Sequence, residues 1–223
     1  MPTPHPNTSP SQAPALSAAE YSLFNQPPLP AAKPAPAQTP EQPEPALTQT
    51  QLPTPLGPML ACATAEGICL LEFTDRPTLD AQLLDLTQRL GALAAPGTNP
   101  HFETLRAQLA EYFAGTRQVF TVPLLTPGTE FQQAVWAELQ RIPYGRTRSY
   151  GQQANALQRP AAVRAVAAAN GQNRLAILIP CHRVIGADGK LTGYAGGLWR
   201  KQRLLALERQ HHLPAEGFQT SLL

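Results

Sequence analysis

Two short apolar segments in the first half of the chain have the pattern of paired β-strands. Residues 58–63 and 68–73 are rich in strand-forming apolar side chains and are separated by Thr-Ala-Glu-Gly. This arrangement predicts a β-hairpin that turns at Gly67. Leucines that recur every three or four residues then predict an amphipathic helix over residues 77–91.

A second helix and a further strand are expected before the middle of the chain. Large apolar residues again recur at helical spacing and are followed by Gly115, a residue type that commonly ends helices. Residues 118–122 have the composition of a short strand. Residues 51–125 are therefore predicted to form an α+β scaffold domain, a small antiparallel sheet with helices on one side. The apolar residues of the second helix are Phe102, Leu105, Leu109 and Phe113.

The second half of the chain, residues 126–212, has the pattern of a helical domain. Thr129 begins a capping-box sequence before an apolar helical face. Ser149 is placed to cap a short helix over residues 150–157, and Pro160 suits the first position of another over 160–170. Two short helices joined by a tight turn, in a basic region, predict a helix-turn-helix unit.

The second of these short helices has almost only methyl groups on its surface. Ala162 and Ala165 flank Arg164, the single long polar side chain of this helix. A major-groove reader needs several polar side chains, whereas a thin helix with one inserted residue suits a groove contact of low sequence preference. The alternative is an ordinary packing helix with one solvated arginine.

Both ends of the chain differ in composition from these two regions. Residues 1–50 are rich in Pro, Ala, Gln and Thr, and 16 of the 25 prolines lie within the first 58 residues. Such a composition predicts a disordered tail. Residues 17–24 within it have a short helical pattern that suits either a docking segment or a tail without a partner. Residues 213–223 are expected to be a C-terminal tail.

Charge is distributed unevenly along the chain. Residues 1–125 hold 5 basic and 10 acidic side chains, whereas residues 126–212 hold 12 basic and 4 acidic ones. The basic half indicates a polyanionic partner such as DNA. Neither a membrane span nor a secretory signal is evident, so no membrane partner is expected. Three cysteines do not make a disulfide framework, which predicts a reducing, cytoplasmic location.

The candidate chemistry lies at Cys181 and His182, which follow an apolar run ending on Pro180. A thiol next to an imidazole can act as a nucleophile once a base removes its proton. The alternative is a structural cysteine at the end of a core strand. Cys62 and Cys69 are expected to be structural, because two further zinc ligands at suitable spacing are missing, and no metal is predicted.

The sequence Pro-Cys-His-Arg-Val at 180–184, together with Gly-Tyr-Ala-Gly-Gly at 193–197, resembles the O6-alkylguanine-DNA alkyltransferases, the methylated-DNA–protein-cysteine methyltransferases. The resemblance covers about residues 54–212. It implies a ribonuclease-H-like sheet domain followed by a winged helix-turn-helix domain, with residues 186–190 as the turn of the wing. It also implies a monomer without a cofactor that binds double-stranded DNA in the minor groove.

The resemblance implies a role for each matching residue. Cys181 would be the nucleophile, with His182 as its base through a water and Glu208 orienting His182. Arg164 would fill the gap left by a flipped nucleotide, with Ala162 and Ala165 beside it on the DNA-binding helix. The remaining assignments are Tyr150 for the phosphate and the flipped base, Asn173 for joining the helix to the active-site turn, and Val184, Tyr194, Ala195 and Lys201 for the substrate pocket.

The function expected from these assignments is DNA repair by irreversible, stoichiometric transfer of the alkyl group of O6-methylguanine to Cys181. O4-methylthymine is expected as a second substrate. Two other classes compete with this interpretation. A thiol hydrolase normally takes its Cys and His from separate segments. A DNA-binding module without enzymatic activity would have the helix-turn-helix but no need of Cys181.

Overall fold

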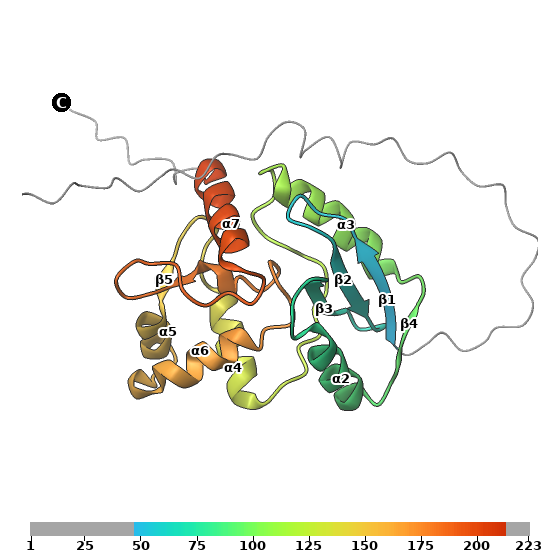
Figure 1. The fold of residues 1–223 in the computed structure, drawn as a ribbon, viewed down its shortest axis with the longest axis horizontal. Helices are drawn as coiled ribbons and strands as arrows, with labels where there is room; N and C mark the ends of the chain where they lie inside the picture. Colours follow the sequence, from blue (N-terminus) through green and yellow to red (C-terminus); the bar gives the residue numbers. More distant parts are fainter. Residues whose placement is uncertain (1–46, 213–223) are drawn as a thin grey trace, which may run out of the picture.

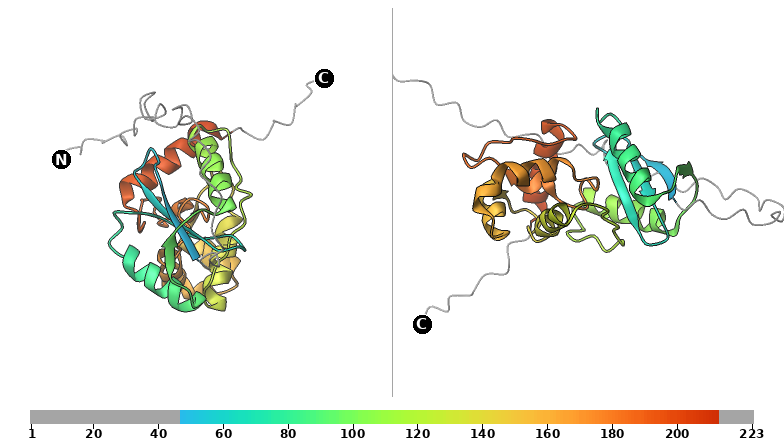
Figure 2. Two further views of the ribbon diagram at one scale, coloured as in Figure 1. Left: turned by 90° about the vertical axis from the view of Figure 1, so that its right-hand side faces the viewer. Right: turned by 90° about the horizontal axis from the view of Figure 1, so that it is seen from below.

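The computed structural model describes residues 47–212, which fold into two domains that lie side by side (Figure 1). The first, here called the sheet domain, runs from β1 to α3, and the second, the helical domain, runs from α4 to α7. The right-hand view of Figure 2 shows them as adjacent halves. The elements are β1 (Leu47–Leu52), β2 (Met59–Ala63), β3 (Ile68–Phe73), α2 (Leu79–Leu90), β4 (Ala94–Pro96), α3 (Pro100–Phe113), α4 (Glu130–Gln140), β5 (Arg148–Ser149), α5 (Tyr150–Ala156), the 3₁₀ turn η1 (Pro160–Ala162), α6 (Val163–Gly171), the 3₁₀ turn η2 (Cys181–Arg183), β6 (Val184–Ile185) and α7 (Leu198–His211).

The N-terminal boundary predicted between residues 50 and 51 is wrong, because it falls inside β1. This strand begins at Leu47, whose side chain is fully buried, and pairs along its length with β2. Residues 48–51 are Thr-Gln-Thr-Gln, and because all four are polar, the sequence pattern did not predict a strand there. The rest of the predicted N-terminal tail and the predicted C-terminal tail lie outside the described residues.

The sheet has the order β3-β2-β1-β4 and is mixed. The predicted hairpin of β2 and β3 is confirmed, with a bulge at Cys62 and Ala63. The sheet is not purely antiparallel, since β4 pairs in parallel with β1. No strand forms at 118–122. The chain there approaches β3 only through an isolated bridge between Leu124 and Ile68.

The two helices of the sheet domain cover opposite faces of the sheet, which corrects the expectation of helices on one side. Leu86 of α2 packs in a small cluster with Cys62 and Leu70. Leu105 of α3 belongs to the main core, together with Met59. Because successive side chains of a strand point to opposite faces, β1, β2 and β3 each supply residues to both clusters.

The helical domain contains the predicted helix-turn-helix. Capping boxes at Thr129 and Ser149 begin α4 and α5, as predicted. The turn η1 starts at Pro160 and leads into α6, so the second helix opens with one 3₁₀ turn. After the turn at Cys181, the Gly186 amide donates to the Lys190 carbonyl at 2.9 Å and closes the predicted turn. Instead of a hairpin, β6 pairs in parallel with β5.

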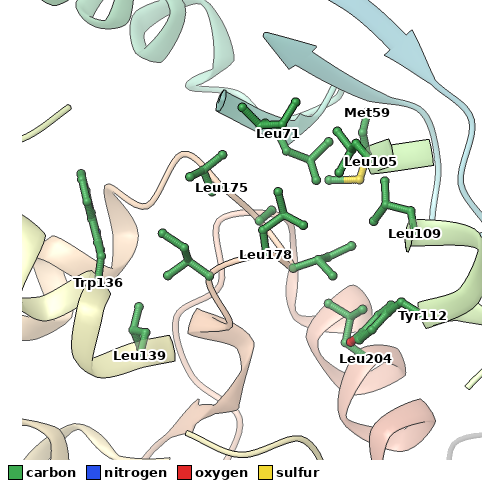
Figure 3. Packing of buried hydrophobic residues seen from close by; sticks show 14 of the residues in the cluster. Met59, Leu71, Leu105, Leu109, Tyr112, Trp136, Leu139, Leu175, Leu178 and Leu204 are labelled. Atoms are coloured by element: carbon green, nitrogen blue, oxygen red, sulfur yellow. The ribbon is translucent and has the colours of Figure 1, made fainter. Parts of the chain in front are cut away.

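One hydrophobic core extends through both domains (Figure 3). Leu71 of β3 is bonded on both sides to the helical domain: its amide donates to the Arg174 carbonyl, and its carbonyl accepts from Ala176, both at 2.8 Å. The apolar run before Cys181 is therefore a series of turns against the sheet rather than a core strand. Ile177 adopts a left-handed φ of 72° there, which costs energy for a β-branched residue. Within residues 47–212 no helix is long and apolar enough to span a membrane.

Two truncated chains test the revised start of the sheet domain. A chain that begins at Gln51 lacks the buried residues Leu47 and Thr48 of β1 and should lose more than about 2 kcal/mol of unfolding free energy. A chain that begins at Leu47 keeps them and is the matched control. Urea unfolding of both chains measures the difference. Equal stabilities would show that the first half of β1 adds nothing to the fold.

Candidate active site

The turn that holds Cys181 is fixed by one buried amide. Asn173 lies just after α6, and its side-chain N–H₂ donates to the Ile179 carbonyl at 2.8 Å and to the Cys181 sulfur at 3.3 Å. Its oxygen accepts from the Leu175 amide at 3.0 Å. A single side chain therefore ties the end of the helix-turn-helix to the sulfur, the arrangement that the resemblance implied for Asn173.

The sulfur faces a pocket of about 360 Å³. Cys181 is partly exposed, whereas Cys62 and Cys69 are buried in the sheet domain. Residues of α6 and the loop at 193–195 both line this pocket. The pocket brings together three predicted site residues from separate segments, Tyr150, Tyr194 and Ala195, and it is completed by Ala167, Asn170, Gly171 and Gly193.

Glu208 of α7 is fully buried and accepts hydrogen bonds from four other residues. His182 Nε2 lies 2.7 Å from its carboxylate, the Tyr112 hydroxyl 2.8 Å and the Gly145 amide 3.0 Å. Arg183 donates through two nitrogens at 2.9 Å each. Burial alone would raise the pKa of Glu208, but its interactions with His182 and Arg183 hold that pKa well below its usual range.

The contact with Glu208 determines which nitrogen of His182 is basic. Because Nε2 donates to the carboxylate, Nδ1 carries the lone pair in the neutral ring. Burial lowers the pKa of His182, against the opposing effect of Glu208. Nδ1 is buried and has no hydrogen-bond partner among residues 47–212. His182 is therefore a neutral base whose free lone pair is available for a proton.

The Cys181 thiol keeps its proton in the resting protein. Burial raises the pKa of Cys181, while the Asn173 hydrogen bond and the positive charges of Lys201 and Arg76 lower it in part. A thiol of this kind reacts slowly until a base takes its proton and a positive field stabilises the thiolate. His182 can act as this base, and the positive charge of Lys201 favours the thiolate.

Lys201 lies beneath the pocket rather than at its rim. Its side chain is fully buried. Nζ donates to the Val184 carbonyl at 2.5 Å, to the Thr192 carbonyl at 2.6 Å and to the Gly193 carbonyl at 3.3 Å. Burial lowers the pKa of Lys201 to about 8. Neither Lys201 nor the buried Val184 is among the residues that line the pocket.

The residues predicted to contact DNA lie on the helix-turn-helix around the pocket mouth. Tyr150 begins α5, lines the pocket and places its hydroxyl 3.4 Å from the carbonyls of Thr192 and Gly193. Arg164 and Ala165 are exposed on α6, and Ala162 is partly exposed just before it. Ala167, which lines the pocket, is three residues after Arg164, so both lie on the same side of the helix.

Sequence reasoning missed several residues that support the site. Tyr112 and Arg183, which share the Glu208 carboxylate, received no role. Gln153 of α5 and Asn170 of α6 exchange two buried hydrogen bonds at 2.7 and 3.2 Å, which join the two helices behind the pocket. For Gln153 and Asn170, the sequence signal was limited to a polar residue next to alanines. Within residues 47–212 no group of three or more His, Cys, Asp or Glu is placed to hold a metal ion.

The chain, a sheet domain joined to a helix-turn-helix with a cysteine at a pocket beside α6, matches one family in both halves. The profile described as the ribonuclease-like domain of 6-O-methylguanine DNA methyltransferase matches residues 47–126. The profile of the DNA-binding domain of the same protein matches residues 130–210. The chain therefore belongs to the methylated-DNA–protein-cysteine methyltransferase family.

Individual relatives and solved structures agree with this assignment. A methylated-DNA–protein-cysteine methyltransferase of Shigella flexneri is 44% identical over 73% of this chain and 95% of its own. One of Mycolicibacterium paratuberculosis is 62% identical, over 47% of this chain and 63% of its own length. The crystal structure of Mycobacterium tuberculosis O6-methylguanine methyltransferase is similar at a TM-score of 0.64 and 41% identity, over 76% of this chain and 96% of that one. A structure of the M. tuberculosis OGT in complex with DNA has a TM-score of 0.61 at 41% identity, over 76% and 95%.

Substitution of Glu208 tests its place at the centre of the hydrogen-bond cluster. Glu208→Gln leaves the Arg183 charge buried without its partner and should cost more than about 3 kcal/mol of unfolding free energy at pH 7. Tyr112→Phe removes one donor and should cost about 1 kcal/mol. Urea unfolding of both variants and the parent provides the comparison.

The same cluster predicts how stability depends on acid. The folded pKa of Glu208 is depressed, so its stabilisation is complete above the unfolded pKa of about 4.3 and is lost as the pH falls below it. Glu208→Gln should lack this part of the acid dependence. A variant with the acid dependence of the parent, or with a stability loss below about 1 kcal/mol, would contradict the role given to the carboxylate.

Proposed function

We propose that this protein repairs DNA by transferring the methyl group of O6-methylguanine to its own Cys181. The observation that carries the proposal is a partly exposed cysteine at a pocket of about 360 Å³, next to a buried His182–Glu208 pair and below a helix-turn-helix. The names of the relatives and the DNA complex of the M. tuberculosis protein support the same reaction.

The transfer is a direct displacement at carbon. A thiolate at Cys181 attacks the methyl carbon, a sulfur–carbon bond forms, and the carbon–oxygen bond breaks with its electron pair going to guanine O6. His182 accepts the thiol proton through a water, and Glu208 stabilises the resulting imidazolium. The positive charge of Lys201 favours the thiolate. The departing guanine takes up a proton and leaves as the normal base.

The groups proposed to hold the base come from the pocket lining and from Val184, which lies outside that lining. In this proposal the carbonyls of Cys181 and Val184 accept from the guanine amino group, the Ala195 amide faces O6 and the Tyr150 hydroxyl faces N3. The Val184 carbonyl already accepts from Lys201, and its second lone pair leaves room for another donor. The methyl carbon is unreachable inside a base stack, so the nucleotide must be flipped out of the duplex.

DNA binding is assigned to the minor groove with low sequence preference. The exposed, alanine-rich surface of α6 offers no set of base-reading side chains other than Arg164. Small side chains at 162 and 165 permit a close approach, and Arg164 fills the space left by the flipped nucleotide.

The product explains why turnover is not expected. A methyl thioether is a poor leaving group, so each molecule acts once, as a monomer and without a cofactor. We include O4-methylthymine as a second substrate of the same pocket and the cytoplasm as the location.

Intact-protein and peptide mass spectrometry tests the reaction. After incubation with duplex DNA containing O6-methylguanine, the peptide with Cys181 should gain the mass of one methyl group in place of a hydrogen. Cys62 and Cys69 are internal controls, because burial raises the pKa of each to about 12. Cys181→Ser should abolish the gain and leave DNA affinity nearly unchanged, since phosphate contacts come from elsewhere. A methyl group on any other residue would refute the assignment of the nucleophile.

The role of Arg164 is tested by comparing duplex with single-stranded substrate. If its side chain fills the vacated stack, Arg164→Ala should slow repair of the duplex by roughly one to three orders of magnitude. Transfer from a single strand should fall far less, because no partner stack needs support there. A solvated arginine would instead weaken both substrates alike through one lost phosphate contact. An unchanged ratio of the two rates would remove Arg164 from the mechanism.

A further inference from the structure

The outer wall of the pocket is a glycine-rich loop that rests on the sheet domain. Gly193, Tyr194 and Ala195 line the pocket, and Gly196 follows them. A Cβ atom at Gly196 would lie 2.9 Å from the ring of Phe73 at the end of β3. The loop therefore passes so close to the sheet domain that only glycine fits at this point.

Arg200, in the first turn of α7, joins this loop to the sheet domain. One of its terminal nitrogens donates to the Gly196 carbonyl at 2.9 Å and also to Asp75 at 2.9 Å. The other terminal nitrogen donates to Asp75 at 2.8 Å, and Nε donates to the Leu56 carbonyl at 2.8 Å. The three partners come from two segments of the sheet domain and from the pocket loop.

The guanidinium is also held between two aromatic rings. Its central carbon lies 4.1 Å from the ring centroid of Phe73 and 4.5 Å from that of Trp199. Gly57 makes room for it, because a Cβ there would lie 3.0 Å from a terminal nitrogen of Arg200. A lysine has neither the planar group for such stacking nor the fork for three separate acceptors.

We propose that Arg200 is a positioning residue through which the sheet domain holds the pocket loop, residues 192–197, in the geometry needed for alkyl transfer. The inference rests on the proposed function and deepens it, because it gives the sheet domain a part in the reaction. Asp75 is 62% exposed in its side chain, so solvent weakens its pairing with Arg200. The contact to the Gly196 carbonyl is buried and is the one that acts on the pocket.

Single-turnover kinetics of Arg200→Lys provide the first test. The rate of transfer is measured against the concentration of methylated duplex, which separates the maximal rate from half-saturation, and again with free O6-methylguanine base. We expect the maximal rate to fall about ten- to a hundredfold for both substrates, because a displaced wall misaligns the base. Half-saturation by duplex should stay within about twofold, because the phosphate contacts lie on other elements.

Hydrogen exchange distinguishes positioning from general support of the fold. In Arg200→Lys the peptide covering 192–198 should exchange faster, while β2 and α4 exchange as in the parent. Arg209→Lys is the matched control, because Arg209 is exposed on the same helix and donates to the Leu205 carbonyl of that helix. It should change neither the rate nor the exchange.

Asp75→Asn keeps the test decisive if Arg200→Lys does not fold. Asp75 is exposed, and Asp75→Asn weakens its pairing with Arg200. The maximal rate should therefore fall by about threefold or more. The proposal is overturned by a maximal rate within about twofold of the parent, by a loss confined to the duplex, or by faster exchange throughout the protein. The parent protein reports on the proposed function separately: without methyl transfer to Cys181, that function fails whatever the variants do.

Discussion

The buried carboxylate of Glu208 is the interaction on which the site depends. It accepts from Tyr112 of α3, Gly145 after α4, and both His182 and Arg183 of the active-site turn. A carboxylate in such surroundings is tolerated only when its hydrogen bonds are complete and its charge is balanced. Packing three segments around this one group of α7 therefore fixes the position of His182 and leaves its Nδ1 atom as the basic nitrogen. The Glu208 carboxylate therefore contributes both to the proposed chemistry of His182 and to the stability of the helical domain.

Backbone hydrogen bonds and a charged side chain join the two domains, in addition to the segment that links them in the chain. Leu71 exchanges backbone hydrogen bonds with the helical domain, and Arg76 donates to the Gly171 carbonyl at 2.8 Å, at the end of α6. Arg76 is also paired with the buried Glu72. A continuous core packs the sheet domain against the turn that carries Cys181, and the contacts of Arg200 join the sheet domain to the pocket loop as well.

In the proposed mechanism the nucleophile is protected at rest and activated in place. Burial keeps the Cys181 thiol protonated, while Asn173 and Lys201 favour the thiolate. The same lysine holds the carbonyls of Thr192 and Gly193, so the charge that assists the sulfur also shapes the pocket loop. A thiol in such surroundings resists unspecific reaction and becomes nucleophilic when a base is aligned.

Sequence patterns that involve only neighbouring residues predicted many features of this structure. The capping boxes at Thr129 and Ser149, the hairpin at Gly67 and the Cys-His motif at 181–182 were readable because each depends on neighbours within a few residues. Only the tertiary structure decided that residues 47–50 join the sheet, that the run before Cys181 is a series of turns, and that Lys201 lies beneath the pocket. Those outcomes depend on partners more than ten residues away, such as β2 for β1 and Val184 for Lys201, and a local pattern contains no information about distant partners.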